Sequence, residues 1–115
     1  MIEKTILNYL ERNTGISCYM EIPKEMPERF IVVEKTGSTR KNWIDSATIA
    51  VQSYDISMFK AAGVNQKVKS SMLAMADTEA SIASVSLNSD YNFTDTSTKR
   101  YRYQAVFGVT YYEED

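Results

Sequence analysis

The hydrophobic residues at the start of the chain recur at the spacing of a helix. Four of them would share one helical face: Ile2, Ile6, Tyr9 and Leu10. This spacing predicts a helix over residues 2–13 with one buried side. Gly15 supplies its end, because glycine readily adopts the left-handed backbone conformation that closes helices.

Two strands with different patterns follow this helix. Over residues 16–22 apolar and polar side chains alternate, which is typical of a strand with one buried face, and Pro23 ends the run. A connection over residues 23–27 leads to residues 29–33, which are mostly apolar and β-branched. Such a run suits a strand that is buried on both faces, so we expect a central strand here.

The middle of the chain predicts a loop and then a third strand. Residues 36–43 are mostly small and polar, and this composition favours a loop that becomes ordered on assembly. Alternation then resumes in a run with two unlike faces. The apolar face carries Ala47, Ile49 and Val51, and the polar face carries Ser46, Thr48 and Gln52. We expect the polar face to meet solvent or a partner.

The second half of the chain predicts one long helix. Apolar residues return to helical spacing over residues 57–76, and either Asp55 or Ser57 can cap the first turn by accepting a backbone hydrogen bond. The buried stripe would consist of Ala61, Val64, Val68, Met72 and Met75. Gly63 lies within this helix, although glycine costs about 1 kcal/mol of helix propensity relative to alanine.

A hairpin of two long strands completes the predicted elements. The strands span about residues 82–93 and 99–112, and the short polar side chains of residues 94–98 favour a turn between them. The order is therefore α-β-β-β-α-β-β. Short connections favour a mainly antiparallel sheet of about five strands, with both helices on one face because each must bury an apolar stripe. The predicted fold class is α+β, in a single domain over residues 1–115.

Composition removes several classes of function. The chain has no histidine, which is the commonest general base near neutral pH and the commonest metal ligand. Catalysis through Ser–His or Cys–His pairs and zinc binding through histidine are therefore excluded. Cys18 is the only cysteine and alternates with apolar neighbours, so we interpret it as a packing residue of a protein folded in a reducing cytosol. We expect no enzymatic activity, no cofactor and no metal.

Charge and hydropathy remove further partners. Lys and Arg number 13 against 15 Asp and Glu, so the chain lacks the overall positive field that drives nucleic-acid binding. No stretch approaches the roughly 20 apolar residues of a membrane span, and we expect neither membrane insertion nor a cleaved export signal. Residues 36–41 lack the spacing of a phosphate loop. We interpret four carboxylates as solvated charges: Glu21, Glu25, Glu28 and Asp90.

The predicted loop 36–43 is one candidate surface for binding another protein. Arg40, Lys41 and Trp43 place two cations next to the only tryptophan, and Trp and Arg are the residue types most enriched at interface hot spots. Exposed charges of this kind contribute little to stability. The alternative that Trp43 closes the edge of the core stays open at this point.

The start of the last strand is the second candidate surface. Arg100 and Arg102 alternate there with Tyr101 and Tyr103, which suits a polar rim with aromatic anchors in a protein interface. Basic residues interleaved with tyrosines also suit single-stranded nucleic acid, whose bases stack on aromatic rings. The acidic balance of the whole chain disfavours that alternative.

Three segments resemble small proteins that tailed phages and prophages of Gram-positive bacteria encode. They are PERFIVVEKTG over residues 27–37, IDSATIAVQSY over residues 44–54, and LNSDYNFTDTSTKRYRYQAVF over residues 87–107. The proteins they resemble are tail terminator or tail-completion proteins. The resemblance spans nearly the whole chain in the same order of elements, and its motifs are structural patterns rather than a catalytic signature.

The resemblance implies a function made of protein contacts. Proteins of this class form a hexameric ring on the last ring of the tail tube, stop its polymerisation and offer a surface to the head–tail connector protein. The chain would then lie in the virion at the head-proximal end of the tail, after synthesis in the cytoplasm of the bacterial host. Two alternatives stay open, a head-completion or connector subunit at the portal side of the same joint and a non-viral regulatory binding module.

Overall fold

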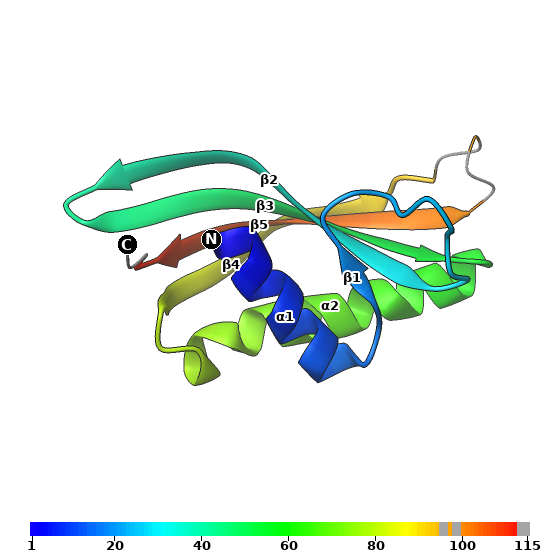
Figure 1. Ribbon diagram of the computed structural model, residues 1–115, viewed down its shortest axis with the longest axis horizontal. Coiled ribbons are helices and arrows are strands. Elements are labelled where there is room, and N and C mark those ends of the chain that lie inside the picture. The colour runs from blue at the N-terminus through cyan, green and yellow to red at the C-terminus, as the bar shows by residue number, and fades with distance from the viewer. Residues whose placement is uncertain (95–96, 98–99, 113–115) are drawn as a thin grey trace.

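A five-stranded sheet carries both helices on one face (Figure 1). The computed structural model describes residues 1–94, 97 and 100–112. Its elements are α1 (Ile2–Thr14), β1 (Cys18–Tyr19), β2 (Phe30–Lys41), β3 (Ile44–Asp55), α2 (Met58–Thr78), β4 (Ile82–Asn92) and β5 (Tyr101–Tyr111). The predicted order of elements and the predicted α+β class are confirmed.

The strand order across the sheet is β1-β2-β3-β5-β4. β1 is parallel to β2, and every other neighbouring pair is antiparallel. β3 and β5 pair from Asp45 opposite Tyr111 to Asp55 opposite Tyr101. The start of β3 therefore lies beside the end of β5, so the turn before β3 and the start of β5 are at opposite ends of the sheet. The molecule measures 44 × 24 × 23 Å along its principal axes.

Both helices begin and end where the sequence predicts, within one or two residues. Gly15 closes α1 in the left-handed conformation with a φ of 71°. Ser57 caps α2 and accepts a hydrogen bond of 3.2 Å from the Lys60 amide. Tyr9 of α1 donates its hydroxyl hydrogen to the Ser71 carbonyl at 2.7 Å, which joins the two helices.

The main core lies between the helices and the covered face of the sheet, which we call the inner face. The predicted stripe of α1 and most of that of α2, from Val64 to Met75, are buried there with Ala47, Ile49 and Val51 of β3. Ala61 of the α2 stripe is buried too. Burying an aliphatic side chain of this size contributes about 1.5–3 kcal/mol. A smaller apolar cluster on the opposite, outer face contains Phe30, Val32 and Tyr54, with Tyr19 and Met26 packed on it.

The first predicted strand is much shorter than the sequence suggests. Only Cys18–Tyr19 is a strand, and although Ile16 and Cys18 are buried, Met20 and Ile22 are exposed. β1 has pairing partners only at Ile31 and Val32 of β2. Beyond Tyr19 the chain leaves the ladder and crosses the outer face, and the prolines at positions 23 and 27 cannot donate to a ladder.

The predicted loop over residues 36–43 is wrong. β2 continues to Lys41 and pairs with β3 along its whole length, with an irregularity of register between Lys35 and Gly37. Asn42 and Trp43 form the turn, with φ values of 52° and 68°, as in the mirror-image turns that suit two-residue hairpins. Small polar residues occur in this strand because it is exposed on both faces.

β4 and β5 confirm the predicted C-terminal hairpin. Of the turn predicted over residues 94–98, positions 95, 96 and 98 lie outside the described residues. Position 99, the first of the second predicted strand, lies outside them too. The described part of β5 begins at Tyr101, close to the predicted start.

Candidate interaction surfaces at the two ends of the sheet

The distal half of the β2–β3 hairpin forms an arm that extends past both helices (Figure 1). We define the arm as residues 34–47. All eight β2 residues in it, from Glu34 to Lys41, are exposed. The exposed part of β2 and the two-residue turn at the tip of the arm are accessible to other molecules.

Arg40 holds the arm together from within. Its Nε lies 2.8 Å from Asp45 Oδ1 and its Nη2 lies 3.1 Å from Asp45 Oδ2, across the β2–β3 pair. Asp45 is only 7% exposed, and a two-pronged pair of this kind fixes both side chains. Arg40 is therefore engaged with a buried carboxylate, whereas Lys41 next to it is exposed.

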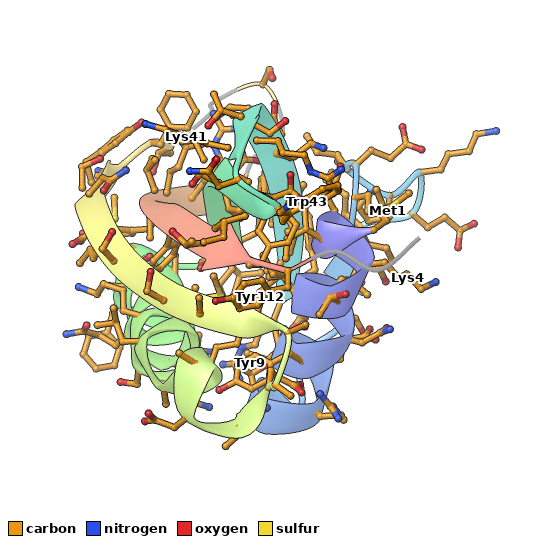
Figure 2. The ribbon with its side chains drawn as sticks, turned by 90° about the vertical axis from the view of Figure 1, so that its left-hand side faces the viewer. Met1, Lys4, Tyr9, Lys41, Trp43 and Tyr112 are labelled. Carbon is orange, nitrogen blue, oxygen red and sulfur yellow. The ribbon has the colours of Figure 1, made fainter. Side chains whose placement is uncertain are left out.

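Trp43 lies at the tip of the arm and is 84% exposed. The alternative that it closes the edge of the core is therefore wrong. Its φ of 68° falls in the left-handed region, which is unfavourable for a bulky residue and which glycine adopts without strain. Figure 2 looks onto this end of the molecule, where Lys41, Met1 and Tyr112 are labelled together with Trp43.

Arg102, at the other end of the sheet, is enclosed by aromatic rings on the outer face. Its Cζ lies 4.2 Å from the centroid of the Phe93 ring and 5.6 Å from that of Tyr54. Its Nη1 donates to the Tyr54 hydroxyl at 2.9 Å, and its Nε donates to the Phe93 carbonyl at 2.6 Å. Tyr54 in turn stacks on Phe30, with centroids 4.3 Å apart. These contacts stabilise the end of the sheet through a cation–π cluster.

A chain of side-chain hydrogen bonds continues from this cluster across three strands. The Tyr54 hydroxyl donates to Gln52 Oε1 at 3.3 Å, and Gln52 Nε2 donates to Gln104 Oε1 at 2.9 Å. Gln104 Nε2 donates to the Tyr91 hydroxyl at 2.5 Å. Sequence reasoning missed this network because Gln52 and Gln104 meet only through the β3–β5 register.

The other predicted residues of this segment do not form one surface with Arg102. Tyr101 and Tyr103 alternate with Arg102 along β5, so they point to the inner side of the sheet, Tyr101 exposed and Tyr103 half-buried. Arg100 donates from Nη2 to the Met26 carbonyl at 3.4 Å. The arm residues and this segment are at opposite ends of β3 and β5, so the two candidate surfaces are separate.

The outer face at the arm end of the sheet is hollowed and lined by small side chains. The hollow has a volume of about 500 Å³, and Gly, Ser and Thr residues of β2, β3, β4 and β5 line most of it. Ser46 and Thr48, from the polar face that the sequence predicts, are among them. A Cβ at Gly108 would lie 3.2 Å from Ser86 Oγ, so a larger residue there would require the Ser86 side chain to shift.

A third feature, an aromatic hollow beside α2, was not predicted from the sequence. We define it by its lining residues, which enclose about 170 Å³: Arg29, Phe59, Lys60, Gly63, Val64 and Lys67. Phe59 is 88% exposed and lies off the buried stripe of α2. The signal available in the sequence is an apolar residue outside the helical stripe, four positions before a glycine.

Cys18 has the environment of a packing residue. It is buried, and its thiol donates to the Ile16 carbonyl at 3.4 Å. Burial, with a smaller contribution from the Glu11 carboxylate, raises the pKa of the thiol to about 12. Since the thiolate is the reactive form, the neutral thiol at physiological pH agrees with the interpretation from the sequence.

Asp90, one of the carboxylates singled out from the sequence, is held by contacts within the subunit. Its carboxylate, which we interpreted from the sequence as a solvated charge, forms an ion pair with Lys69 at 3.3 Å and accepts a hydrogen bond from Asn65 at 3.4 Å. Over residues 1–94, 97 and 100–112, no three His, Cys, Asp or Glu residues gather in a way that could hold a metal ion. Within the same part of the chain, no helix has the length and apolar character needed to cross a membrane.

Comparisons with known proteins show a likeness in fold. No model of a protein family matches the chain, and no curated protein matches it. A solved chain from the structure described as "Virion of native gene transfer agent (GTA) particle" matches with a TM-score of 0.63 and 11% sequence identity. The match covers 94% of this chain and 90% of that chain. A chain of a virion particle therefore adopts the fold of this protein along nearly its whole length.

Proposed function

We propose that this protein is a structural component of a phage virion, and that it acts as a tail terminator. It caps the tail tube, stops its polymerisation and provides the surface on which the head–tail connector protein docks. It does this without catalysis, through contacts with itself, with the tail tube protein and with the connector. The observation that carries the proposal is the likeness to a chain of a virion particle, which covers nine-tenths or more of both chains.

The geometry supports a role between neighbouring subunits. Candidate contact residues lie at opposite ends of a molecule 44 Å long, with the arm at one end and the Arg102 cluster and the aromatic hollow towards the other. Contacts between unlike patches of identical subunits generate a ring when the rotation closes. Such a layout fits the hexameric ring that the sequence resemblance implies.

A connector subunit at the portal side of the joint is the second candidate. The likeness to a virion chain supports it equally, because a connector belongs to the same particle and also works through contacts at two ends. Neither role requires the charge or the clustered ligands of an enzyme.

Deleting the gene from its phage or prophage distinguishes these functions. Electron microscopy of the particles should show overlong tails that carry no heads, because an uncapped tube continues to grow. Tails of normal length beside separate, filled heads would indicate the connector role instead. Normal virions in the deletion strain would contradict both.

A further inference from the structure

The aromatic hollow combines an apolar floor with a basic rim. Phe59 and Val64 supply apolar surface, while Arg29, Lys60 and Lys67 surround it. Arg29 is oriented by its ion pair with Asp55, at 2.8 Å between Nε and Oδ2. A ring with an electron-rich face fits such a site, because cations are attracted to aromatic faces and rings stack on one another.

Gly63 opens this hollow at a cost to the helix. A Cβ built on Gly63 meets nothing within 4 Å among the described residues, and the residue does not have a positive φ. Neither packing within the described chain nor backbone conformation therefore requires glycine, although alanine would favour the helix. A side chain from outside the subunit that occupies the hollow would account for glycine at this position.

Trp43, at the other end of the molecule, is likewise a residue that its local structure does not favour. Glycine is the residue that suits its left-handed position in a two-residue turn, yet the chain has a tryptophan there with an exposed indole. Non-glycine residues held at such positions mark functional sites in many proteins. The Arg40–Asp45 pair directly behind the turn fixes the tip, which reduces the entropy lost on docking.

We propose that Trp43 of one copy inserts into the aromatic hollow of a second copy, between Phe59 and the basic rim. Tryptophan is the best partner for cation–π contacts and a frequent interface hot spot. The cations that line the hollow, Arg29, Lys60 and Lys67, complement the electron-rich face of the indole. The contact joins unlike ends of identical subunits. It deepens the proposed function, since it would link the subunits of the cap.

A mixing experiment tests this contact directly. Trp43→Ala removes the inserted ring but keeps the hollow, and Phe59→Ala removes the wall of the hollow but keeps the ring. Wild-type protein should associate at concentrations up to about 1 mM in sedimentation or light-scattering measurements, and each variant alone should associate at least about tenfold more weakly. An equimolar mixture of the two variants should form dimers and nothing larger, because it retains one intact contact per pair.

Control variants separate loss of the contact from loss of the fold. Trp43→Gly and Gly63→Leu should raise or maintain the melting temperature while they abolish association, because each removes an unfavourable residue from its element. Leu73→Ala, which truncates an exposed side chain of α2 outside the hollow, should leave association unchanged.

Three results would overturn the proposal. They are wild-type protein that stays monomeric at about 1 mM, association that survives both Trp43→Ala and Phe59→Ala, and a mixture that forms no dimers. If Trp43→Ala prevents binding to tail tubes but leaves self-association intact, the tip binds the tube protein and the contact between copies is wrong. The proposed function would stand in that case, since it depends on the phenotype of the gene deletion.

Discussion

The ion pair of Arg40 with Asp45 gives this residue a different role from the one that its sequence context suggests. The sequence suggests a cation available to a partner, in a segment where lost charges should hardly affect stability. The structure commits its guanidinium to Asp45, whose carboxylate is buried. Removing one member of such a pair leaves a buried charge without compensation, which is a structural defect in its own right.

Arg40→Ala should therefore lower the free energy of unfolding by about 1–3 kcal/mol, the cost of leaving a buried acceptor without its donor. Lys41→Ala is the matched control, since Lys41 is the exposed neighbour and its loss should change stability by less than about 0.5 kcal/mol. Denaturant unfolding measures both. Equal midpoints for the two variants would contradict the structural role of Arg40.

Cys18 gives a prediction for the dependence of stability on pH. The pKa of its thiol is raised from 9.0 to about 12 in the folded protein, mainly by burial. The unfolded chain therefore releases this proton first, so the contribution of the neutral thiol to stability is complete below pH 9 and declines as pH rises from there towards 12. The stability difference between wild type and Cys18→Ala should shrink between pH 8 and about 10.5, measured by urea unfolding. A constant difference over this range would show that Cys18 is ionised as easily when folded as when unfolded.

Helix α2 is the element whose packing follows most directly from the sequence. Its predicted stripe is buried along the whole helix, because the spacing of apolar residues alone determines which side faces the sheet. Asn65 is an addition that the pattern does not indicate, since its amide is buried beside the stripe and donates to Asp90.

Val68→Ala in this helix should lower the free energy of unfolding by about 1–3 kcal/mol, through lost apolar burial and a residual cavity. Val68 is fully buried, whereas Leu73 on the same helix is exposed. Leu73→Ala should accordingly shift the unfolding midpoint much less. A midpoint for Val68→Ala that matches the wild type would mean that the stripe does not face the core.

The elements that the sequence misassigns are those defined by their partners. Residues 36–41 read as a loop because they are exposed on both faces, so their side chains carry no period, and only pairing with β3 makes them a strand. β1 shows the opposite error, since alternation over residues 16–22 indicates a strand that has partners at two positions only. Local spacing predicts helices well here, while strand length depends on contacts distant in the chain.

The candidate surfaces also divide into residues that the local sequence identifies and residues that only distant contacts bring together. Trp43 can be selected from its residue type alone, because a lone tryptophan beside cations is unusual in any conformation. Phe59 cannot, because the aromatic hollow forms only where Arg29, at the end of the long connection after β1, comes to lie beside α2. The outer network likewise requires the register of β3 and β5.

At the scale of the whole molecule, the long sheet separates the two halves of the proposed contact. The arm tip and the start of α2 lie at opposite ends of β3, which runs from the turn at Trp43 to Asp55, just before Ser57 caps α2. Contacts between unlike ends of identical subunits close into a ring when the rotation between neighbours allows it, which is the arrangement that the proposed cap requires. Function then depends on both ends of every subunit.

Phage particles that carry Trp43→Ala should consequently have overlong tails or tails without heads, because subunits that cannot dock leave the tube uncapped. The purified variant should melt at or above the wild-type temperature, since alanine at the turn is no more strained than tryptophan, and this result separates lost contact from lost fold. Supplying Phe59→Ala from a second gene copy should not restore normal tails, because the two variants together form pairs and cannot close a ring. Electron microscopy of tail lengths measures each case. Tails of normal length joined to heads in the Trp43→Ala phage would show that the arm tip takes no part in the cap, and the Arg102 cluster at the other end of the sheet would then be the surface to test.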